Sequence, residues 1–141
     1  MTERGTAPLA RITNEPIDEA AVHAAVDAPD CGAVLVFRGV IRNHDGGHSV
    51  ASLEYSAHPE AERFLASVVA EESQRSGVAL AAVHRIGALE IGDAALVAAS
   101  AAPHRGEAFA ALEQLVERIK HEIPIWKRQH FSSGSTEWVG L

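Results

Sequence analysis

Apolar residues recur along this chain with two different periods, and each period predicts one kind of element. Alternation or short apolar runs predict strands at residues 9–13, 51–55, 78–86 and 94–100. A continuous apolar run at 32–37 predicts a strand that is buried on both faces. Helical spacing predicts one helix at 17–26, a second from Pro59 to Gly77 and a third from Arg105 to about His121.

The predicted order is roughly β-α-β-β-α-β-β-α, followed by one short C-terminal segment. This order predicts an α+β fold in which a mixed or antiparallel sheet is covered by helices. No repeat or linker divides the sequence, so we expect residues 1–141 to form one domain, with residues 1–7 loose. Residues 39–49 are polar and contain glycines, so we expect a long, mobile loop there.

Composition narrows the classes of function. The 141 residues carry a net charge of −7, which argues against general nucleic-acid binding because such binding needs a basic surface. Cys31 is the only cysteine, so an internal disulfide is excluded, and we favour a buried strand-edge thiol over a nucleophile. The N-terminal residues lack a signal-peptide hydrophobic region, and no apolar run reaches the ~18 residues of a membrane span, so we expect a cytoplasmic protein.

The most informative segment is 120–128, in which two lysines stand seven residues apart around a proline. Pro124 disfavours helix at the residue before it, so the third helix should end there. Lys120 then lies in the last helical turn and Lys127 on the segment that leaves it, with Trp126 as an apolar wall. Two converging cations suit an anionic substrate, or a lysine whose pKa is lowered. Taken alone, Lys120 also fits a lysine that extends along apolar surface to a glutamate on the same helix.

Two further segments carry signals for anion binding. Residues 103–106 place His104 and Arg105 between a strand and a helix N-terminus, where backbone N–H groups favour phosphate. Residues 37–44 leave a strand and enter the glycine-rich loop, where Arg42 could contact a phosphate through two N–H groups. Taken alone, each segment is also compatible with a solvated turn or loop.

Eight histidines raise the question of a metal site. His44 and His48 are four residues apart, but a glycine-rich loop lacks the fixed geometry of a helix, and no cysteine or acidic cluster nearby completes a tetrahedral ligand set. The sequence contains no P-loop, no dinucleotide-binding glycine motif and no serine nucleophile elbow. We therefore expect no functional metal site.

Taken together, these segments resemble the large, catalytic subunit of molybdopterin synthase. The matching motifs are Phe37-x-Gly39-x-x-Arg42-Asn43-His44, Ser100-x-x-x-His104-Arg105 and Lys120-x-x-x-Pro124-x-Trp126-Lys127-Arg128. Gly87, the Gly92-Asp93 turn and Trp138-Val139 also fit, so the resemblance extends from about Arg11 to Val139. Its specificity comes from the order and spacing of the motifs together.

The resemblance implies a reaction, a fold and an assembly. Members of this family, which have the α/β hammerhead fold, convert cyclic pyranopterin monophosphate to molybdopterin by adding two sulfurs as a dithiolene. The sulfur arrives as a thiocarboxylate on the C-terminal Gly-Gly of a small ubiquitin-like subunit, whose tail enters a pocket of the large subunit. The family assembles as a dimer of large subunits with one small subunit at each end. No metal or organic cofactor is required, because the partner carries the sulfur.

The resemblance also implies roles for individual residues in this pocket. Lys120 matches the central catalytic lysine, which would stabilise negative charge and act as a general acid/base. Lys127 matches the second lysine, which would position the substrate and stabilise charge. The candidates for substrate binding are Arg42, His104, Arg105, Arg128, Val40, Ile41 and Gln129. Residue 129 departs from the family, in which this position is often acidic, because an amide keeps the hydrogen-bonding group without the charge.

Two other classes of function remain open on sequence alone. The protein could be a non-catalytic module that binds a phosphate-bearing ligand or a partner, or a plain oligomeric scaffold with solvated basic residues. Helical spacing gives the third helix one apolar stripe of Phe109, Leu112, Val116 and Ile119. Such a stripe is compatible with a core and with a dimer interface.

Overall fold

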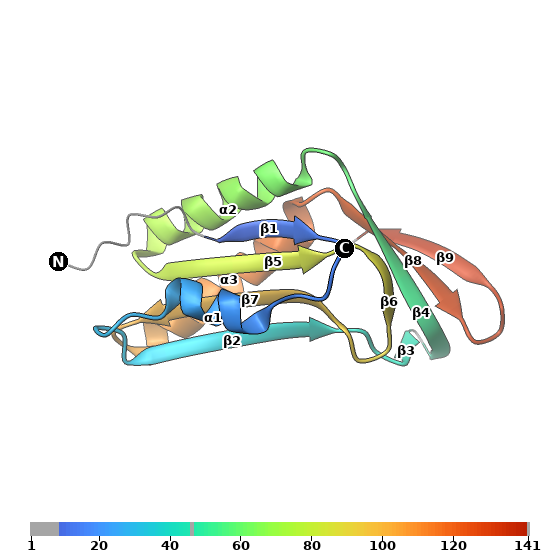
Figure 1. The fold of residues 1–141 in the computed structure, drawn as a ribbon, viewed down its shortest axis with the longest axis horizontal. Coiled ribbons are helices and arrows are strands. Elements are labelled where there is room, and N and C mark those ends of the chain that lie inside the picture. The colour runs from blue at the N-terminus through green and yellow to red at the C-terminus, as the bar shows by residue number, and fades with distance from the viewer. Residues whose placement is uncertain (1–8, 46, 141) are drawn as a thin grey trace.

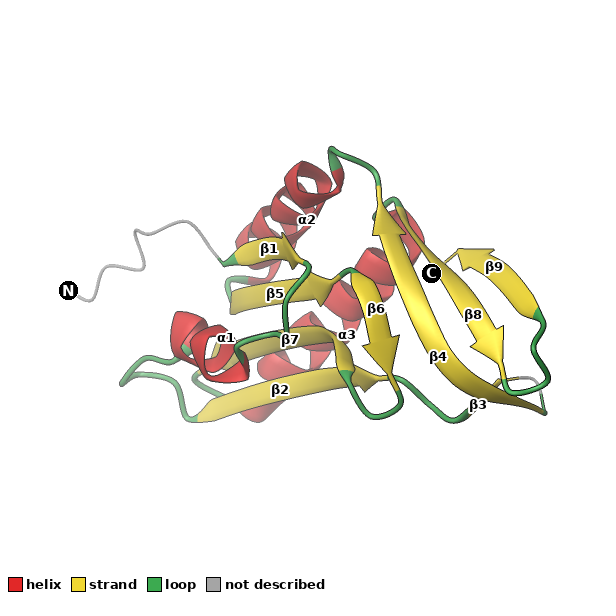
Figure 2. Cartoon of the chain, turned by 45° about the vertical axis from the view of Figure 1, so that its right-hand side comes forward, coloured by secondary structure: helices red, strands yellow, loops and turns green. Residues whose placement is uncertain are grey.

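The computed structural model describes residues 9–45 and 47–140, so the expected loose segment 1–7 lies outside the described residues. In this part of the chain, three helices pack on one β-sheet and a second sheet projects from its end (Figures 1 and 2). The predicted α+β class is confirmed. The predicted sheet is divided in two, one mixed and one antiparallel.

The first sheet has the strand order β1-β5-β7-β2. Strand β1 (Ala10–Thr13) is parallel to β5 (Ala79–Arg85), whereas β7 (Ala94–Ala102) is antiparallel to both β5 and β2 (Ala33–Val40). The inner strand β7 is almost wholly buried, but β2 is an edge strand on which Val36 is 45% exposed. The prediction that residues 32–37 are buried on both faces is therefore wrong, because an apolar run does not distinguish a central strand from an edge strand.

The second sheet is built around β4 (His48–Ala57). One side of β4 pairs with β8 (Ile125–Phe131), which pairs in turn with β9 (Thr136–Gly140). The other strands that pair with β4 are β3 (His44–Asp45) and β6 (Gly87–Glu90). The expected loop at 39–49 thus contains strand residues, and the expected short C-terminal segment is a hairpin. These strands are short or polar, so they lack the apolar alternation that reveals a strand in sequence.

Glycines allow the chain to pass between the two sheets. Gly87 follows β5 and opens β6 with a φ of 94°, a conformation that a residue with a Cβ atom rarely adopts. Gly92, at a φ of 90°, turns the chain back into the first sheet. The turn is closed by the Asp93 carboxylate, which accepts a hydrogen bond from the Glu90 amide at 2.9 Å. The end of β5 therefore lies where the two sheets meet (Figure 2).

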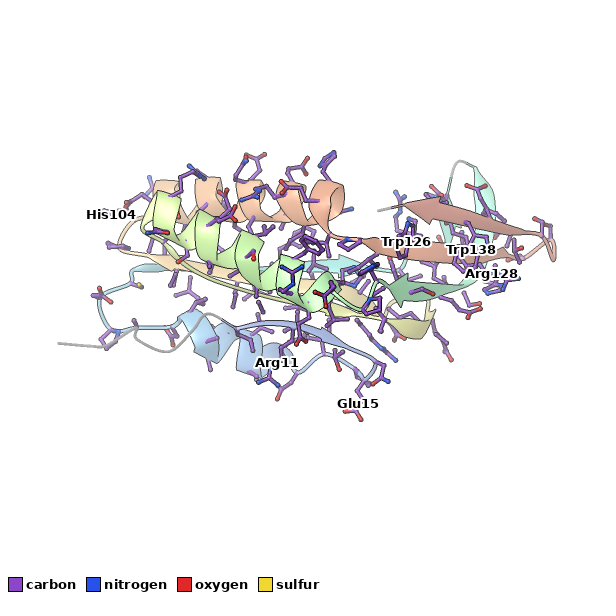
Figure 3. The ribbon with its side chains drawn as sticks, turned by 90° about the horizontal axis from the view of Figure 1, so that it is seen from above. Arg11, Glu15, His104, Trp126, Arg128 and Trp138 are labelled. Atoms are coloured by element: carbon purple, nitrogen blue, oxygen red, sulfur yellow. The ribbon has the colours of Figure 1, made fainter. Side chains whose placement is uncertain are left out.

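The helices cover both faces of the first sheet. Helix α1 (Glu19–Val26) packs on β5 and β7, and α2 (Ala61–Ser76) and α3 (Arg105–Glu122) lie together on the opposite face (Figure 3). Gly77 ends α2 in the left-handed conformation, as predicted, with a φ of 72°. In the described part of the chain, no helix combines the length and apolarity that crossing a membrane requires.

Helices α2 and α3 are joined by a partly buried ion-pair network. Arg118 of α3 donates to Glu72 of α2 at 3.0 Å and to Glu71 at 3.1 Å, and it also pairs with Glu122 at 2.7 Å. Glu72 is only 4% exposed and accepts further hydrogen bonds from Arg75. The hydrogen bonds from Arg75 and then from Arg118 hold the pKa of the Glu72 carboxyl below its ordinary value, although burial opposes them.

Replacing Arg118 should test this network. We expect Arg118→Met to lower the free energy of unfolding at pH 7 by about 2 kcal/mol, because it leaves a buried carboxylate with one partner fewer. The pKa of Glu72 is lower in the folded than in the unfolded state, so this stabilisation is present above the unfolded pKa and is lost as pH falls through the folded pKa. The difference between wild type and variant should therefore shrink in acid, as measured by urea denaturation across pH.

Arg63→Met is the matched control, because its ion pair with Glu60 lies on the surface of α2 with side chains that are 65% and 51% exposed. We expect this change to alter stability by less than about 1 kcal/mol. Equal effects of the two substitutions would contradict a special contribution of the buried network.

Candidate active site

A cavity of about 290 Å³ lies where the second sheet meets the first sheet and the C-terminal end of α3. Its walls come from β2, β5 and β7 of the first sheet, from β3, β4 and β8 of the second sheet, and from α3. A cavity of this size at the junction of two sheets can hold part of a small ligand or an extended peptide end.

Lys120 and Lys127 both line this cavity, and they are the only lysines in the sequence. The predicted break is confirmed: α3 ends at Glu122, and β8 begins directly after Pro124. The pKa of Lys127 is lowered, chiefly because burial penalises its charged form and further because Lys120 and Arg42 repel it. The Asp45 and Glu137 carboxylates act in the opposite direction. The predicted convergence of the two cations is therefore what the structure shows.

The residues beside Lys127 on β8 point the other way. Successive side chains of a strand face opposite sides, so Trp126 and Arg128 lie on the outer face of the second sheet. Trp126 is 44% exposed, and the Arg128 guanidinium lies 5.6 Å from the ring centre of Trp138 on the neighbouring strand β9 (Figure 3). The prediction that Trp126 forms a wall of the lysine pocket is wrong, and Arg128 is not among the residues that line the cavity of one chain. The assignment of Arg128 to substrate binding stays a prediction.

Arg42, Asp45 and Gln129 form a connected group in the cavity. Gln129 is 2% exposed, and its amide donates to the Asp45 carboxylate at 2.8 Å. Arg42 approaches the other oxygen of Asp45 at 3.6 Å. The pKa of Asp45 is lowered mainly by the hydrogen bond from Gln129 and also by the charges of Lys127 and Arg42. Gln129 therefore holds the Asp45 carboxylate in the cavity.

Val40 and Ile41 also line the cavity, at the point where β2 ends. Ile41 is 3% exposed, and its backbone exchanges hydrogen bonds with the turn at Gly92 and Asp93. This contact fixes the start of the segment that carries Arg42. Three predicted substrate-binding positions at 40–42 and Gln129 are therefore in the same cavity as the two lysines.

His104 and Arg105 do not reach this cavity. His104 precedes α3 and Arg105 is its first residue, and both are exposed. Lys120 follows Arg105 by fifteen positions in the same helix, which is about 22 Å at the helical rise per residue. Figure 3 shows His104 near one end of the molecule, and Trp126, the neighbour of Lys127 in the chain, far from it toward the second sheet. Within one chain, the two groups of predicted residues cannot contact the same small ligand.

His84 and Tyr55 are cavity residues that the sequence interpretation did not identify. His84 ends the buried run of β5 and is 3% exposed, and its ring lies edge-on to the Tyr55 ring at 5.0 Å. Burial lowers the pKa of His84 to about 4 and raises the pKa of Tyr55 to about 12, so both groups are neutral at pH 7. The sequence contained a signal for His84: it is a polar residue at the end of an apolar strand, and polar side chains are seldom fully buried without a specific role.

The arrangement suits an anionic ligand. The cavity walls contain the cations Lys120, Lys127 and Arg42 and one carboxylate, Asp45. In the described ranges no three His, Cys, Asp or Glu side chains are grouped closely enough to hold a metal ion. The cavity can therefore bind negative charge, donate hydrogen bonds to it and transfer a proton through a lysine amine.

Comparison with known proteins shows the family to which this chain belongs. The model of the MoaE protein family matches residues 12–122. The chain is 44% identical to molybdopterin synthase catalytic subunit 1 of Mycobacterium tuberculosis H37Rv, over 99% of this chain and 96% of the relative. It is 40% identical to the molybdopterin synthase catalytic subunit of Bacillus subtilis strain 168, over 92% of this chain and 83% of the relative.

A crystal structure of molybdopterin synthase from Staphylococcus aureus has the same fold. It superposes with a TM-score of 0.86 at 34% identity, and the match covers 100% of both chains. The family model ends at residue 122 and so includes Lys120, and the match to the Mycobacterium tuberculosis relative extends through β8, which carries Lys127. This chain therefore belongs to the MoaE family, the family of molybdopterin synthase catalytic subunits, which are enzymes of molybdenum cofactor biosynthesis.

Proposed function

We propose that this protein transfers sulfur from the thiocarboxylated C-terminus of a small ubiquitin-like subunit to cyclic pyranopterin monophosphate, and so forms the dithiolene of molybdopterin. The observation that carries the proposal is the convergence of the only two lysines, with Arg42, on one cavity. Family membership supports the reaction class. A cytoplasmic location, expected from the sequence, belongs to the same proposal.

The charges of the reactants match those of the cavity. A thiocarboxylate and a substrate phosphate are both anions, and they would meet three cations in a partly dehydrated site, where electrostatic attraction is stronger than in water. Each carrier delivers one sulfur, so two carriers are needed for one dithiolene. The sulfur bonds to a substrate carbon as a carbon–oxygen bond of that carbon breaks and the oxygen leaves as water or phosphate. The acyl carbon–sulfur bond of the carrier breaks afterwards. Water supplies the oxygen with which the carrier leaves as a carboxylate, and the sulfur stays on the product.

Lys120 is the residue to which we assign proton transfer and stabilisation of the charge that develops as sulfur attacks. It projects from the last turn of α3 into the cavity and remains accessible to a ligand. Lys127 and Arg42 would hold the anionic groups. Lys127 suits this role because burial destabilises its charged ammonium group, and a bound anion would stabilise that charge.

His104 and Arg105 can serve the same substrate if two copies of the chain share the site. The middle of α3 borders an apolar groove whose walls come from the edge strand β2 and from Phe109, Leu112 and Val116. Phe109 is 59% exposed, and β2 has no neighbour on its outer side among the described strands. An exposed apolar edge of this kind is typical of an interface.

A two-fold axis through this groove would bring the separated residues together. Leu112 lies halfway between Arg105 and Lys120 along α3. If this axis is perpendicular to α3, the two α3 helices run antiparallel, so the N-terminus of one lies near the C-terminus of the other. His104 and Arg105 of a second copy would then complete the cavity that contains Lys120. The homodimer, with one small subunit bound to each large subunit, is part of the proposal.

Lys120→Ala is the direct test of catalysis. We expect single-turnover conversion of cyclic pyranopterin monophosphate, with the purified thiocarboxylated small subunit, to slow by at least about a hundredfold, because the proton-transferring group is lost. The control is His121→Ala, since His121 is the next residue of α3, is exposed and lies outside the cavity walls. A variant that reacts as fast as wild type would remove Lys120 from the mechanism. A folded wild-type protein that binds the small subunit without forming product would favour the non-catalytic binding module.

Mixing two inactive variants tests the shared site. We expect Lys120→Ala and Arg105→Ala each to be poorly active when alone. After random mixing, about half of the dimers contain one chain of each variant, and each such dimer has one intact cavity. Activity should therefore return to about a quarter of all cavities. The control mixture is Lys120→Ala with Lys127→Ala, two changes in the same cavity of one chain, which should not complement. Activity that stays absent in the first mixture would place Arg105 outside the site.

A further inference from the structure

His84 is a buried polar residue that core packing alone does not explain. The buried polar residues in the described part of the chain are Glu72, His84, Ser100 and Gln129. The other three join two elements: Glu72 links α2 to α3, the Ser100 hydroxyl donates to the Ala108 carbonyl of α3 at 2.9 Å, and Gln129 holds Asp45. Among the described residues, the imidazole of His84 has one hydrogen-bond partner, the backbone of its own neighbour Arg85, so this bond connects no two elements.

This hydrogen bond determines the protonation of the ring. Nδ1 of His84 lies 2.8 Å from the carbonyl oxygen of Arg85. A carbonyl oxygen only accepts, so Nδ1 must carry the hydrogen and donate it. The ring is neutral at pH 7, because burial lowers its pKa to about 4. Nε2 therefore has a lone pair and no hydrogen, and it is the ring nitrogen left to accept a hydrogen bond in the cavity.

The groups that face His84 leave few donors for this nitrogen. Tyr55 of β4 contacts the ring edge-on, and Lys120 of α3 is the charged group whose field opposes protonation of the imidazole. Lys127 of β8 lies across the same cavity, and Asp45 is engaged by Gln129 and Arg42. The structure shows no hydrogen-bond partner for Nε2 among the described residues. Lys120 lines the same cavity on a flexible stem, and its charge acts on His84, whose pKa it helps to lower.

We propose that His84 is a positioning residue for Lys120, and that its Nε2 accepts a hydrogen bond from the Lys120 ammonium group in the working enzyme. The inference rests on the proposed function, because it assigns a task to Lys120. A lysine ammonium has three N–H donors and no acceptor. With one donor held by His84, the other two point toward the anion. A neutral acceptor orients the lysine without cancelling its charge, which a carboxylate in this position would do.

Two substitutions separate positioning from a purely structural role. The amide nitrogen of His84→Asn can replace Nδ1 and keep the bond to the Arg85 carbonyl, but no acceptor replaces Nε2. The longer side chain of His84→Gln places an amide oxygen where Nε2 was and gives up the bond to the carbonyl. If Nε2 positions Lys120, Gln should preserve activity better than Asn. If the residue is only structural, Asn should be at least as good as Gln.

The first readout is the single-turnover rate at saturating small subunit and substrate. We expect His84→Asn to slow sulfur transfer about tenfold at unchanged affinity for the small subunit, and His84→Gln to remain within about threefold of wild type. Urea denaturation of both variants reports any loss of stability separately. Equal rates for the two variants, or rates that follow stability, would overturn the inference. A wild-type protein that forms no product would instead defeat the proposed function.

The second readout does not depend on turnover. Lys120 and Lys127 are the only lysines, so acylation by acetic anhydride can be followed at each by peptide mass spectrometry. Removing the acceptor should free the Lys120 amine from its contact with Nε2, so at a given pH acylation of Lys120 should be faster in His84→Asn than in wild type or His84→Gln. Lys127 provides the internal control. Unchanged Lys120 acylation in the Asn variant would contradict the hydrogen bond.

Discussion

The antiparallel pairing of β4 with β8 is the constraint on which the cavity depends. Its register sets Tyr55 opposite Lys127 and Leu53 opposite Gln129, and directly paired residues of two strands share a face. All four side chains therefore face the end of the first sheet, where α3 delivers Lys120. A shift of one residue would turn Lys127 outward and Trp126 inward, because side chains alternate along a strand. The position of one cation thus depends on a ladder of backbone hydrogen bonds, not on any contact of the lysine itself.

The distribution of charge explains how an acidic chain contains a basic cavity. Most described arginines are in ion pairs with carboxylates, as Arg38 is with Glu19 and Arg118 is with Glu72. In the residues that the structure describes, neither lysine has an ion-pair partner within 4.0 Å. The carboxylate inside the cavity, Asp45, is shared between Gln129 and Arg42. The net charge of −7 thus arises from residues outside the cavity, and the cations of the cavity can still attract an anion.

Sequence was sufficient where a local rule decided the outcome. Pro124 ends α3, so the two lysines on either side of it could be predicted to converge. Two errors could have been avoided by the same rules: alternation along β8 separates Trp126 from Lys127, and the helical rise separates Arg105 from Lys120. The edge position of β2 could not be predicted, because it depends on the strand order of the first sheet. That order is set by contacts between segments far apart in the chain.

An exposed apolar groove and a basic pair distant from the cavity both lie along α3, and neither has a partner within the described part of one chain. The apolar groove beside the middle of α3 exposes Phe109 next to an edge strand, a surface that water solvates poorly and that invites pairing. The basic pair before and at the start of α3 has no anion site of its own among the described cavities. One symmetric contact between two chains along the groove would bury Phe109 and bring His104 and Arg105 of one chain to the lysine cavity of the other. Stability of the dimer and assembly of the site would then be coupled, so a change in the groove at Phe109 would be expected to alter catalysis without touching the cavity.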